Sequence, residues 1–458
     1  MMATVPVNHT VWQRRFNNLN SRINDLKNQF IKITPPFYRY QTLNKLTECL
    51  QVFAGKQFDY FHQGFANNVL KHSPEFPPDH VLTVTLQQIS YDLEAIQWAV
   101  NQRLHAQAGM MEALQIGDKL AWAALKPALN LLQLNLDQDI TVVTYFQKFA
   151  EIRVIPYASV ALIGLPITCI GADIETMVAR DYLATPHEVG HYVYWHAKKA
   201  VGDGDKLEPL YLYLQSEAKA RGVSEGREWL EEVFADVYGC LVAGPVIAQS
   251  FQDLQLRIRR KWFLTDDGEH PTPYIRPDIY SKVLHKQFNT AWADRMDQMW
   301  QNKRNGRMMF EENGRAQVAQ QPENGPMLTY DGKEKSPADF ISRLDSQEEN
   351  KPVDIMANLI LETLAEIEQP AWWWQYEKIE KDPPAELDLY ARFNEHVRAD
   401  DLLPSAPPDP DDIACKPAES LHEQWRLQDV EDGDPDWLPI FKAGGWSTKG
   451  PENNPVGG

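Results

Sequence analysis

The sequence predicts a mixed α+β fold that is mostly helical and contains one small sheet. Apolar residues recur at helical spacing through the first 138 residues and again in several later segments. Three segments rich in β-branched and aromatic residues lie together between residues 140 and 167. Strands that are followed by a run of helices are typical of an α+β arrangement rather than of alternating βαβ units.

Residues 1–138 predict an N-terminal helical domain. Residues 11–33 place Phe16, Ile23 and Phe30 on one helix face, and two prolines at positions 35 and 36 end that helix. A second helical segment covers residues 40–70, and residues 81–136 are long enough for two helices. We expect a helical bundle here without chemistry of its own.

Residues 139–300 predict a core of mixed structure. Strands are expected at 140–146, 151–157 and 160–167, and helices at 174–199 and 225–251. The uncharged stretch from 154 to 172 is close to the length of a membrane span. Its prolines, glycines and β-branched residues favour buried strands over a spanning helix.

The rest of the chain divides into a C-terminal helical and irregular region, 301–382, and an acidic, proline-rich tail, 383–458. One helix is predicted at 353–378, and the tail is predicted to be extended or partly disordered. Three tryptophans in the tail are expected to dock on the folded body: Trp425, Trp437 and Trp446. The N-terminal helical region and this Trp-rich region are the expected surfaces for a regulatory protein partner.

Charge and cysteine content disfavour several classes of protein. Asp and Glu number 64 against 45 Lys and Arg, a net charge of −19, which argues against binding to nucleic acids or anionic membranes. The four cysteines lie far apart in the sequence, which predicts no disulfide framework and fits a reducing compartment: Cys49, Cys169, Cys240 and Cys415. The N-terminus has no apolar segment typical of a signal peptide, so we expect a cytoplasmic protein.

Residues 185–191 read TPHEVGH and contain the pattern H-E-x-x-H. On a helix, His187 and His191 lie on one face and can direct two imidazoles at one metal ion. Glu188 lies beside them, where it can take a proton from metal-bound water. Thr185 and Pro186 suit a helix start, and the aromatic residues that follow indicate a buried helix. The alternative is a helix with two structural histidines.

The third ligand is expected from a later helix. His196 follows His191 by five residues and would point elsewhere on a continuing helix, so it is not a ligand. Glu232 and Asp236 are four residues apart in the apolar segment 229–241, where unpaired carboxylates are costly. We expect Glu232 to bind the metal and Asp236 to orient a ligand histidine. The spacing to Asp236 favours Glu232 over its neighbour, Glu231, whose replacement is predicted to leave zinc occupancy unchanged. The alternative is that both acids face solvent.

H-E-x-x-H followed by E-x-x-x-D on a downstream helix resembles the gluzincins, the thermolysin-like zinc metallopeptidases. The resemblance covers residues 140–285 and implies a zincin-like metallopeptidase core with one Zn²⁺ per chain. It implies that His187, His191 and Glu232 bind the zinc, that Glu188 is the general base, and that Asp236 supports a ligand. It further implies hydrolysis of protein or peptide substrates, by an endopeptidase rather than an exopeptidase.

Two further segments are similar to parts of gluzincins. Residues 269–276, EHPTPYIR, are similar to a segment that follows the zinc helices, which implies that His270, Tyr274 or Arg276 stabilises the oxyanion. The alternative is an ordinary proline-rich surface loop. The resemblance also implies that residues 154–168 form an edge strand that pairs with an extended substrate. The alternative is a core strand.

Other functions remain open at the level of sequence. The chain could be a catalytically silent zincin-like scaffold that binds proteins, although such a scaffold has no reason to retain Glu188. It could be a peptidase effector or toxin that acts in another cell. The tail could dock through its tryptophans, or it could cover the active site, with Cys415 offering a thiolate to the zinc.

Overall fold

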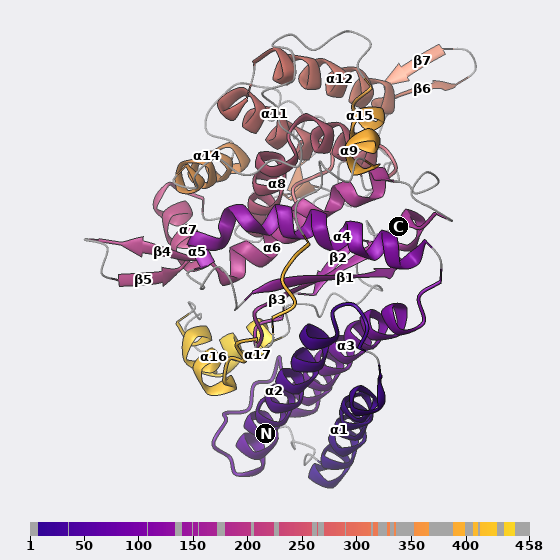
Figure 1. The fold of residues 1–458 in the computed structure, drawn as a ribbon. Helices are drawn as coiled ribbons and strands as arrows, with labels where there is room; N and C mark the ends of the chain where they lie inside the picture. Colours follow the sequence, from indigo (N-terminus) through magenta and orange to yellow (C-terminus); the bar gives the residue numbers. More distant parts are fainter. Residues whose placement is uncertain are drawn as a thin grey trace. The chain divides into compact units, whose positions relative to one another are not determined.

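The structure is a computed structural model of the whole chain (Figure 1). The residues that it describes are 8–34, 36–107, 109–132, 140–148, 150–153, 155–171, 179–202, 206–223, 229–258, 263, 270–288, 290–312, 315–318, 328–329, 334–335, 352–365, 388–398, 406–410, 413–427 and 435–444. Over these residues the fold is mostly helical with small sheets, as predicted.

The chain forms two compact units, each built from segments that are far apart in the sequence. Unit 1 comprises residues 1–114, 134–167 and 406–458, and unit 2 comprises residues 115–133 and 168–405. Each of the four regions expected from the sequence was one continuous stretch of chain. Each observed unit instead combines segments that are distant in the sequence.

Three long helices form the larger part of unit 1: α1 (His9–Lys32), α2 (Tyr40–Ala66) and α3 (Pro78–Leu104). Asn8 caps α1 by accepting a hydrogen bond from the Val11 N–H at 3.2 Å. The apolar faces pack against one another, and the rings of Phe16 and Phe58 stack with centroids 4.4 Å apart. The helices predicted in this part of the chain are therefore confirmed, with α2 ending four residues earlier than expected.

A three-stranded sheet in unit 1 has the order β1 (Thr141–Gln147), β3 (Val160–Pro166), β2 (Glu151–Arg153). Strand β1 runs parallel to β3, and β2 runs antiparallel to it. All three predicted strands are present, although β2 ends at Arg153 and residues 155–157, predicted as part of it, are not in a strand. The prediction of an edge strand at 154–168 is wrong, because β3 is the central strand and pairs with β1 on one side and with β2 on the other. Among the described residues, no helix is both long and apolar enough to cross a membrane.

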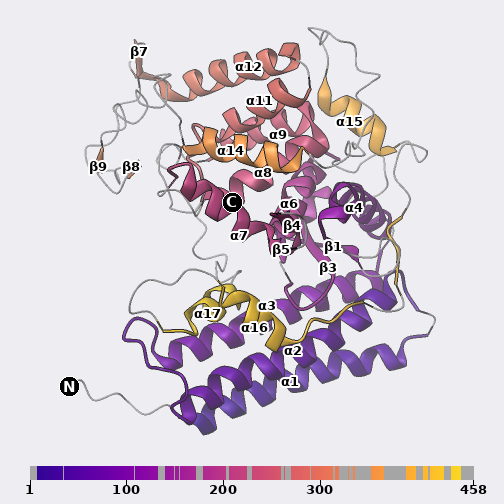
Figure 2. The same ribbon diagram turned by 90° about the vertical axis from the view of Figure 1, so that its left-hand side faces the viewer.

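The C-terminal segment is folded onto the helices of unit 1, which corrects the expectation of an extended tail. Helices α16 (Ala418–Trp425) and α17 (Leu438–Gly444) lie beside α2 and α3 (Figure 2). Trp425 and Trp437 are buried, and the Trp437 indole N–H donates to the Lys71 carbonyl at 2.8 Å. Docking of these two tryptophans is confirmed, whereas Trp446 lies outside the described residues.

Two further contacts hold this segment in unit 1. Asp409 accepts hydrogen bonds from the Thr42 N–H and hydroxyl at 2.9 and 2.6 Å, and so caps the start of α2 from a distant part of the chain. Cys49 and Cys415 form a disulfide, so the prediction of no disulfide framework is wrong for this pair. Disulfides are typical of oxidising compartments, which is contrary to the expected reducing one. The disulfide also excludes Cys415 as a zinc ligand.

Unit 2 contains most of the remaining helices, and α4 (Met110–Leu125) runs from residues of unit 1 into it. Its helices are η1 (Lys126–Ala128), α5 (Leu129–Leu132), η3 (Ala179–Ala184), α6 (Thr185–His196), α7 (Leu210–Ala220), α8 (Trp229–Ala243), α9 (Pro245–Gln255), α11 (Arg276–Gln287), α12 (Thr290–Met308), α14 (Pro352–Leu364) and α15 (Leu389–Arg398). A short 3₁₀ helix, η2 (Ile167–Cys169), follows β3. The tail thus contains helix α15 as well. The helix predicted at 353–378 is present as α14 as far as Leu364, and residues 366–378 lie outside the described residues.

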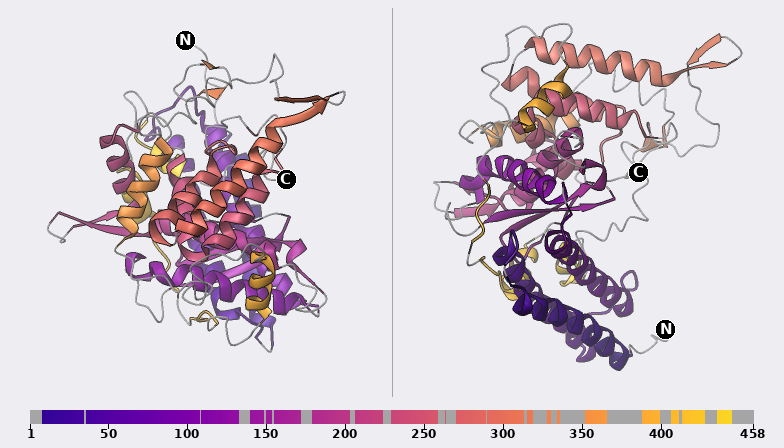
Figure 3. Two further views of the ribbon diagram at one scale, coloured as in Figure 1. Left: turned by 90° about the horizontal axis from the view of Figure 1, so that it is seen from above. Right: turned by 45° about the vertical axis from the view of Figure 1, so that its right-hand side comes forward.

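Three small hairpins complete the described structure. They pair β4 (Lys198–Val201) with β5 (Lys206–Pro209), β6 (Met309–Glu312) with β7 (Arg315–Val318), and β8 (Leu328–Thr329) with β9 (Glu334–Lys335). The β4–β5 hairpin directly follows α6, and Figure 3 shows β6 and β7 continuing from the end of α12. Each hairpin is antiparallel and is separate from the sheet of unit 1.

Helices α6 and α8 pack directly against each other at the centre of unit 2. Small residues allow this close approach: a β-carbon added at Gly190 of α6 would lie 2.7 Å from the Cα of Ala235 on α8. A β-carbon at Gly239 of α8 would lie 3.1 Å from the His187 backbone nitrogen. The two glycines therefore bring the H-E-x-x-H helix and the E-x-x-x-D helix into backbone contact.

Candidate metal centre

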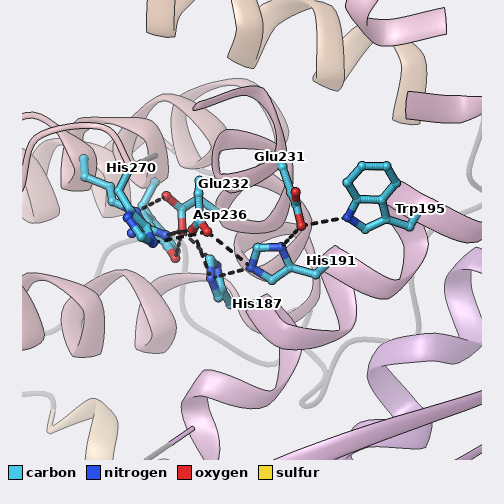
Figure 4. Close-up of polar contacts among 9 residues, drawn as sticks. His187, His191, Trp195, Glu231, Glu232, Asp236 and His270 are labelled. Carbon is cyan, nitrogen blue, oxygen red and sulfur yellow. Dashed lines mark hydrogen bonds and ion pairs between the residues drawn. The ribbon is translucent and has the colours of Figure 1, made fainter. Parts of the chain in front are cut away.

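Three side chains from α6 and α8 gather their donor atoms at one point of unit 2 (Figure 4). His187 and His191 come from successive turns of α6, and Glu232 comes from the first turn of α8. One donor atom of each residue lies within 4.8 Å of the donor atoms of the other two. This His-His-Glu group could hold a metal ion, and it is the group expected from the sequence.

The distances within the group fit a shared ion. The two Nε2 atoms are 3.2 Å apart, and the Glu232 carboxylate oxygens lie 3.6 Å from His187 Nε2 and 3.8 Å from His191 Nε2. Ligands of a tetrahedral zinc ion, with bonds of about 2.0–2.2 Å, lie roughly 3.3 Å from one another. The donor set also fits zinc, which binds imidazole and carboxylate ligands together.

Each histidine turns its other ring nitrogen toward a carboxylate. His187 Nδ1 lies 2.9 Å from Asp236 Oδ1, and His191 Nδ1 lies 2.8 Å from Glu231 Oε1. A proton on Nδ1 leaves the Nε2 lone pair free to bind a metal ion. Glu231 therefore hydrogen-bonds the His191 ring, whereas Asp236 contacts His187 Nδ1 as an ion pair without hydrogen-bond geometry, and the two Nε2 atoms face each other. The 3.2 Å separation of the two Nε2 atoms is that of a hydrogen bond with a proton between them, and a metal ion held there would take the place of that proton.

Asp236 is fully buried, and charged and polar groups surround it. Arg276 Nε donates to Oδ2 at 2.7 Å, and its terminal nitrogen donates to Oδ1 at 3.1 Å. The Tyr280 hydroxyl donates to Oδ1 at 2.9 Å. Burial raises the pKa of Asp236, but Arg276 and His187 outweigh it, so the net pKa lies below the ordinary value. Asp236 is therefore an ionised carboxylate next to His187.

Glu232 is also held in its ionised form. Arg276 donates to Glu232 Oε2 at 2.7 Å, and His270 Nε2 lies 3.3 Å from Oε1. Burial raises the pKa of Glu232, whereas His270, Arg276 and His191 lower it, and the net pKa is well below the ordinary value. A ligand carboxylate must be deprotonated, so this environment suits a metal site.

The field of the acids acts strongly on His191. Burial lowers the pKa of this histidine, but the carboxylates of Glu232, Glu231 and Glu188 outweigh burial and raise the pKa to about 9. The acids thus favour a positive charge on His191, and a metal ion bound through its Nε2 would displace the proton from that atom. Glu188 is half-buried on α6, next to His187.

The three residues expected to stabilise an oxyanion differ in their positions. His270 contacts Glu232 but lies outside the His-His-Glu donor group. Arg276 is buried, engages Glu232 and Asp236, and stacks on Phe251 with its guanidinium carbon 4.7 Å from the ring centre. Its observed contacts are therefore with the candidate ligand Glu232, with Asp236 and with the Phe251 ring. His270 and Arg276 thus both contact Glu232 at the edge of the donor group.

Tyr274 is engaged on another side of unit 2. Its carbonyl accepts a hydrogen bond from the Trp300 indole at 3.2 Å, and its ring lies 4.9 Å from the Arg304 guanidinium carbon. Both partners belong to α12. These contacts describe a packing role for Tyr274.

The sequence reasoning missed three residues of the site. Glu231 was treated only as an alternative to Glu232, Trp195 was treated only as an apolar neighbour, and Tyr280 was not considered. A signal was present for Trp195, which follows His191 by four residues and so shares its helix face. No comparable signal was present for Tyr280, which comes from α11.

Comparison of the chain with protein-family models, curated proteins and solved structures gives no match. The resemblance to gluzincins therefore depends on the residues of the site alone. What the structure adds is that the two motifs, 41 residues apart between His191 and Glu232, lie on adjacent helices with their donor atoms together.

Proposed function

We propose that the chain is a zinc-dependent metallopeptidase that hydrolyses peptide bonds, with Glu188 as general base. The observation that supports this proposal most directly is the pairing of each ligand histidine with its own carboxylate, at 2.9 Å for His187 and 2.8 Å for His191. Two imidazoles and one carboxylate form a three-ligand set of the kind that leaves a fourth position open for water or substrate.

His187, His191 and Glu232 would hold the zinc ion, which would supply a water of lowered pKa and a Lewis acid for the scissile carbonyl. His187 and His191 bind through neutral imidazoles, which Asp236 and Glu231 hold in the required tautomer. Glu188 accepts a proton from the attacking water and passes it to the leaving amine. His270, at the edge of the donor group, is the residue that we assign to hydrogen bonding with the oxyanion.

The substrate class that fits this chemistry is a protein or peptide. An endopeptidase is favoured over an exopeptidase by the resemblance of the two motifs to those of thermolysin-like enzymes. A non-catalytic scaffold would need the ligands and their supporting acids for stability, but it would not need Glu188, which is half-buried beside them.

The test compares the wild-type chain with Glu188→Gln and with Glu395→Gln, a matched change at an exposed position of α15. Zinc per chain is measured by elemental analysis, and hydrolysis is measured with a mixture of internally quenched peptides. We expect one zinc per chain in all three proteins. Hydrolysis should fall by about 10²–10⁴-fold in Glu188→Gln alone, the range for loss of a general base.

Two results would contradict the proposal. Wild-type protein that binds no zinc after zinc is supplied would exclude the metal site. Zinc-loaded Glu188→Gln that cleaves peptides at the wild-type rate would exclude Glu188 as the base, while leaving the metal site intact.

A further inference from the structure

A single oxygen atom connects the second metal-ligating histidine to a tryptophan. Glu231 Oε1 lies 2.8 Å from His191 Nδ1 and also accepts a hydrogen bond from the Trp195 indole N–H at 2.8 Å (Figure 4). His191 and Trp195 are four residues apart on α6, so both side chains leave the same helix face. Glu231 reaches them from the first turn of α8.

Adjacent acids on α8 contact opposite sides of the His191 ring. Consecutive residues on a helix point about 100° apart, so Glu231 and Glu232 diverge from neighbouring positions. Glu232 lies 3.8 Å from Nε2, and Glu231 lies 2.8 Å from Nδ1. Helix α8 therefore supplies both the third ligand and the group that orients the second one.

The two orienting carboxylates are held in different ways. Asp236, beside His187, has a fully buried side chain and is fixed by Arg276 and Tyr280. The Glu231 side chain is 32% exposed, and in water a carboxylate can rotate away from its partner. Trp195 provides a second donor to the same oxygen. The indole is itself held by aromatic contacts with Tyr194 and Tyr211, whose ring centres lie 5.2 and 4.7 Å away.

We propose that Glu231 and Trp195 are positioning residues for the metal ligand His191, and that Trp195 acts by holding the Glu231 carboxylate against Nδ1. The inference rests on the proposed metal site and specifies how its second histidine is oriented. It differs from the expectation from spacing alone, in which replacement of Glu231 leaves zinc occupancy unchanged. Carboxylates that bind a ligand histidine in this way raise its basicity and fix its ring, and their loss commonly weakens metal binding 10–100-fold.

The experiment measures zinc affinity of the full chain by competition with a chromophoric chelator. The variants are Glu231→Ala, Glu231→Gln, Trp195→Phe and the double variant Glu231→Ala/Trp195→Phe. Trp98→Phe is the matched control, because Trp98 is partly exposed on α3 of unit 1 and packs on Tyr145. Circular dichroism and thermal unfolding of the zinc-free proteins show whether each variant is folded.

We expect Glu231→Ala to weaken zinc binding by about 10–100-fold. Glu231→Gln keeps an acceptor oxygen but loses the charge, so its affinity should lie between those of Glu231→Ala and wild type. Trp195→Phe should weaken binding several-fold. The double variant should bind zinc no more weakly than Glu231→Ala, because Trp195 has no carboxylate left to hold. Trp98→Phe should bind zinc as the wild type does.

Three results would overturn the inference. Wild-type affinity in folded Glu231→Ala would exclude an orienting role for Glu231. Effects of Glu231→Ala and Trp195→Phe that add in the double variant would show that Trp195 acts through packing and not through the carboxylate. A wild-type chain that binds no zinc would remove the proposed function as well. If either of the first two results were found while the wild type bound zinc and hydrolysed peptides, the inference would be wrong and the proposed function would still be supported.

Discussion

The close contact of α6 and α8 at Gly190 predicts a large effect of a single methyl group. Gly190→Ala adds a β-carbon that would lie 2.7 Å from Ala235 Cα and 3.2 Å from both the Ala235 β-carbon and its carbonyl oxygen. Non-bonded carbon atoms prefer about 3.5–4.0 Å. Because the closest atom belongs to the backbone, the helices must separate by roughly 1 Å to accept the methyl group.

Two opposing terms set the change in the free energy of unfolding. Overpacking of this kind costs about 1–3 kcal/mol. Replacing a glycine in a helix interior by alanine contributes about 1 kcal/mol in the opposite direction. We therefore expect a net loss of about 0–2 kcal/mol. The proposed metal site should be affected as well, since a shift of about 1 Å between the histidines and Glu232 exceeds the ligand tolerance of about 0.2 Å.

The assay combines thermal unfolding of the zinc-free protein with zinc affinity measured by chelator competition. Gly55→Ala on α2 is the matched control, because a β-carbon there would meet no atom within 4 Å. The control should gain up to about 1 kcal/mol from helix propensity and bind zinc as the wild type does. Gly190→Ala should bind zinc at least about 10-fold more weakly.

The reasoning would be refuted if Gly190→Ala were stabilised as much as Gly55→Ala and bound zinc with wild-type affinity. That result would mean that α6 and α8 adjust to the methyl group without moving the ligands. Loss of stability with unchanged zinc affinity would show that the helices separate at Gly190 but that the donor atoms stay together.

Two further predictions concern the C-terminal segment of unit 1. Cys49→Ser removes a disulfide between residues 366 apart, and it should lower the free energy of unfolding by about 2–5 kcal/mol in urea titrations of the oxidised protein. The control is Cys169→Ser, which changes a free cysteine. Four titratable thiols in the oxidised wild type would contradict the disulfide. Burial and Arg426 lower the pKa of His422 to about 4, against the opposing effect of Glu419. The unfolded chain, with a histidine pKa near 6.5, then binds more protons than the folded chain between about pH 6.5 and 4, so stability should fall as the pH falls through that window. Urea unfolding of wild type and His422→Asn at pH 7 and pH 5 measures this, and an equal pH dependence in both proteins would contradict it.

Local patterns in the sequence were sufficient to predict most helices and strands and the types of residue in the candidate site. The long helices of unit 1, the strands and the helices within the predicted segments 174–199 and 225–251 follow from periodicity, which neighbouring residues determine, although α6 ends at His196 and residues 198–199 belong to β4. His187 and His191 share a face of α6 because four residues make about one helical turn. The ligand group was therefore expected from its residues before their arrangement was known.

Features that join distant segments could not be predicted in the same way. The Cys49–Cys415 disulfide depends on how the chain returns to its N-terminal helices, and so does the surface on which Trp425 and Trp437 dock, although docking itself was expected. The central place of β3 in its sheet depends on pairing with both β1 and β2. Local sequence patterns do not identify which distant segments contact one another, because those contacts depend on the packing of the whole unit.

The sequence by itself determined that two imidazoles and several carboxylates would stand at one-turn spacing on two helices. Only the tertiary structure decided that Glu231 faces His191 Nδ1, that Glu232 faces the Nε2 atoms, and that Arg276 joins Glu232 to Asp236. The physical reason is that the spacing of side chains along a helix is local. Which side chains of two helices meet depends on their mutual rotation and distance, and here Gly190 and Gly239 allow the close approach of α6 and α8.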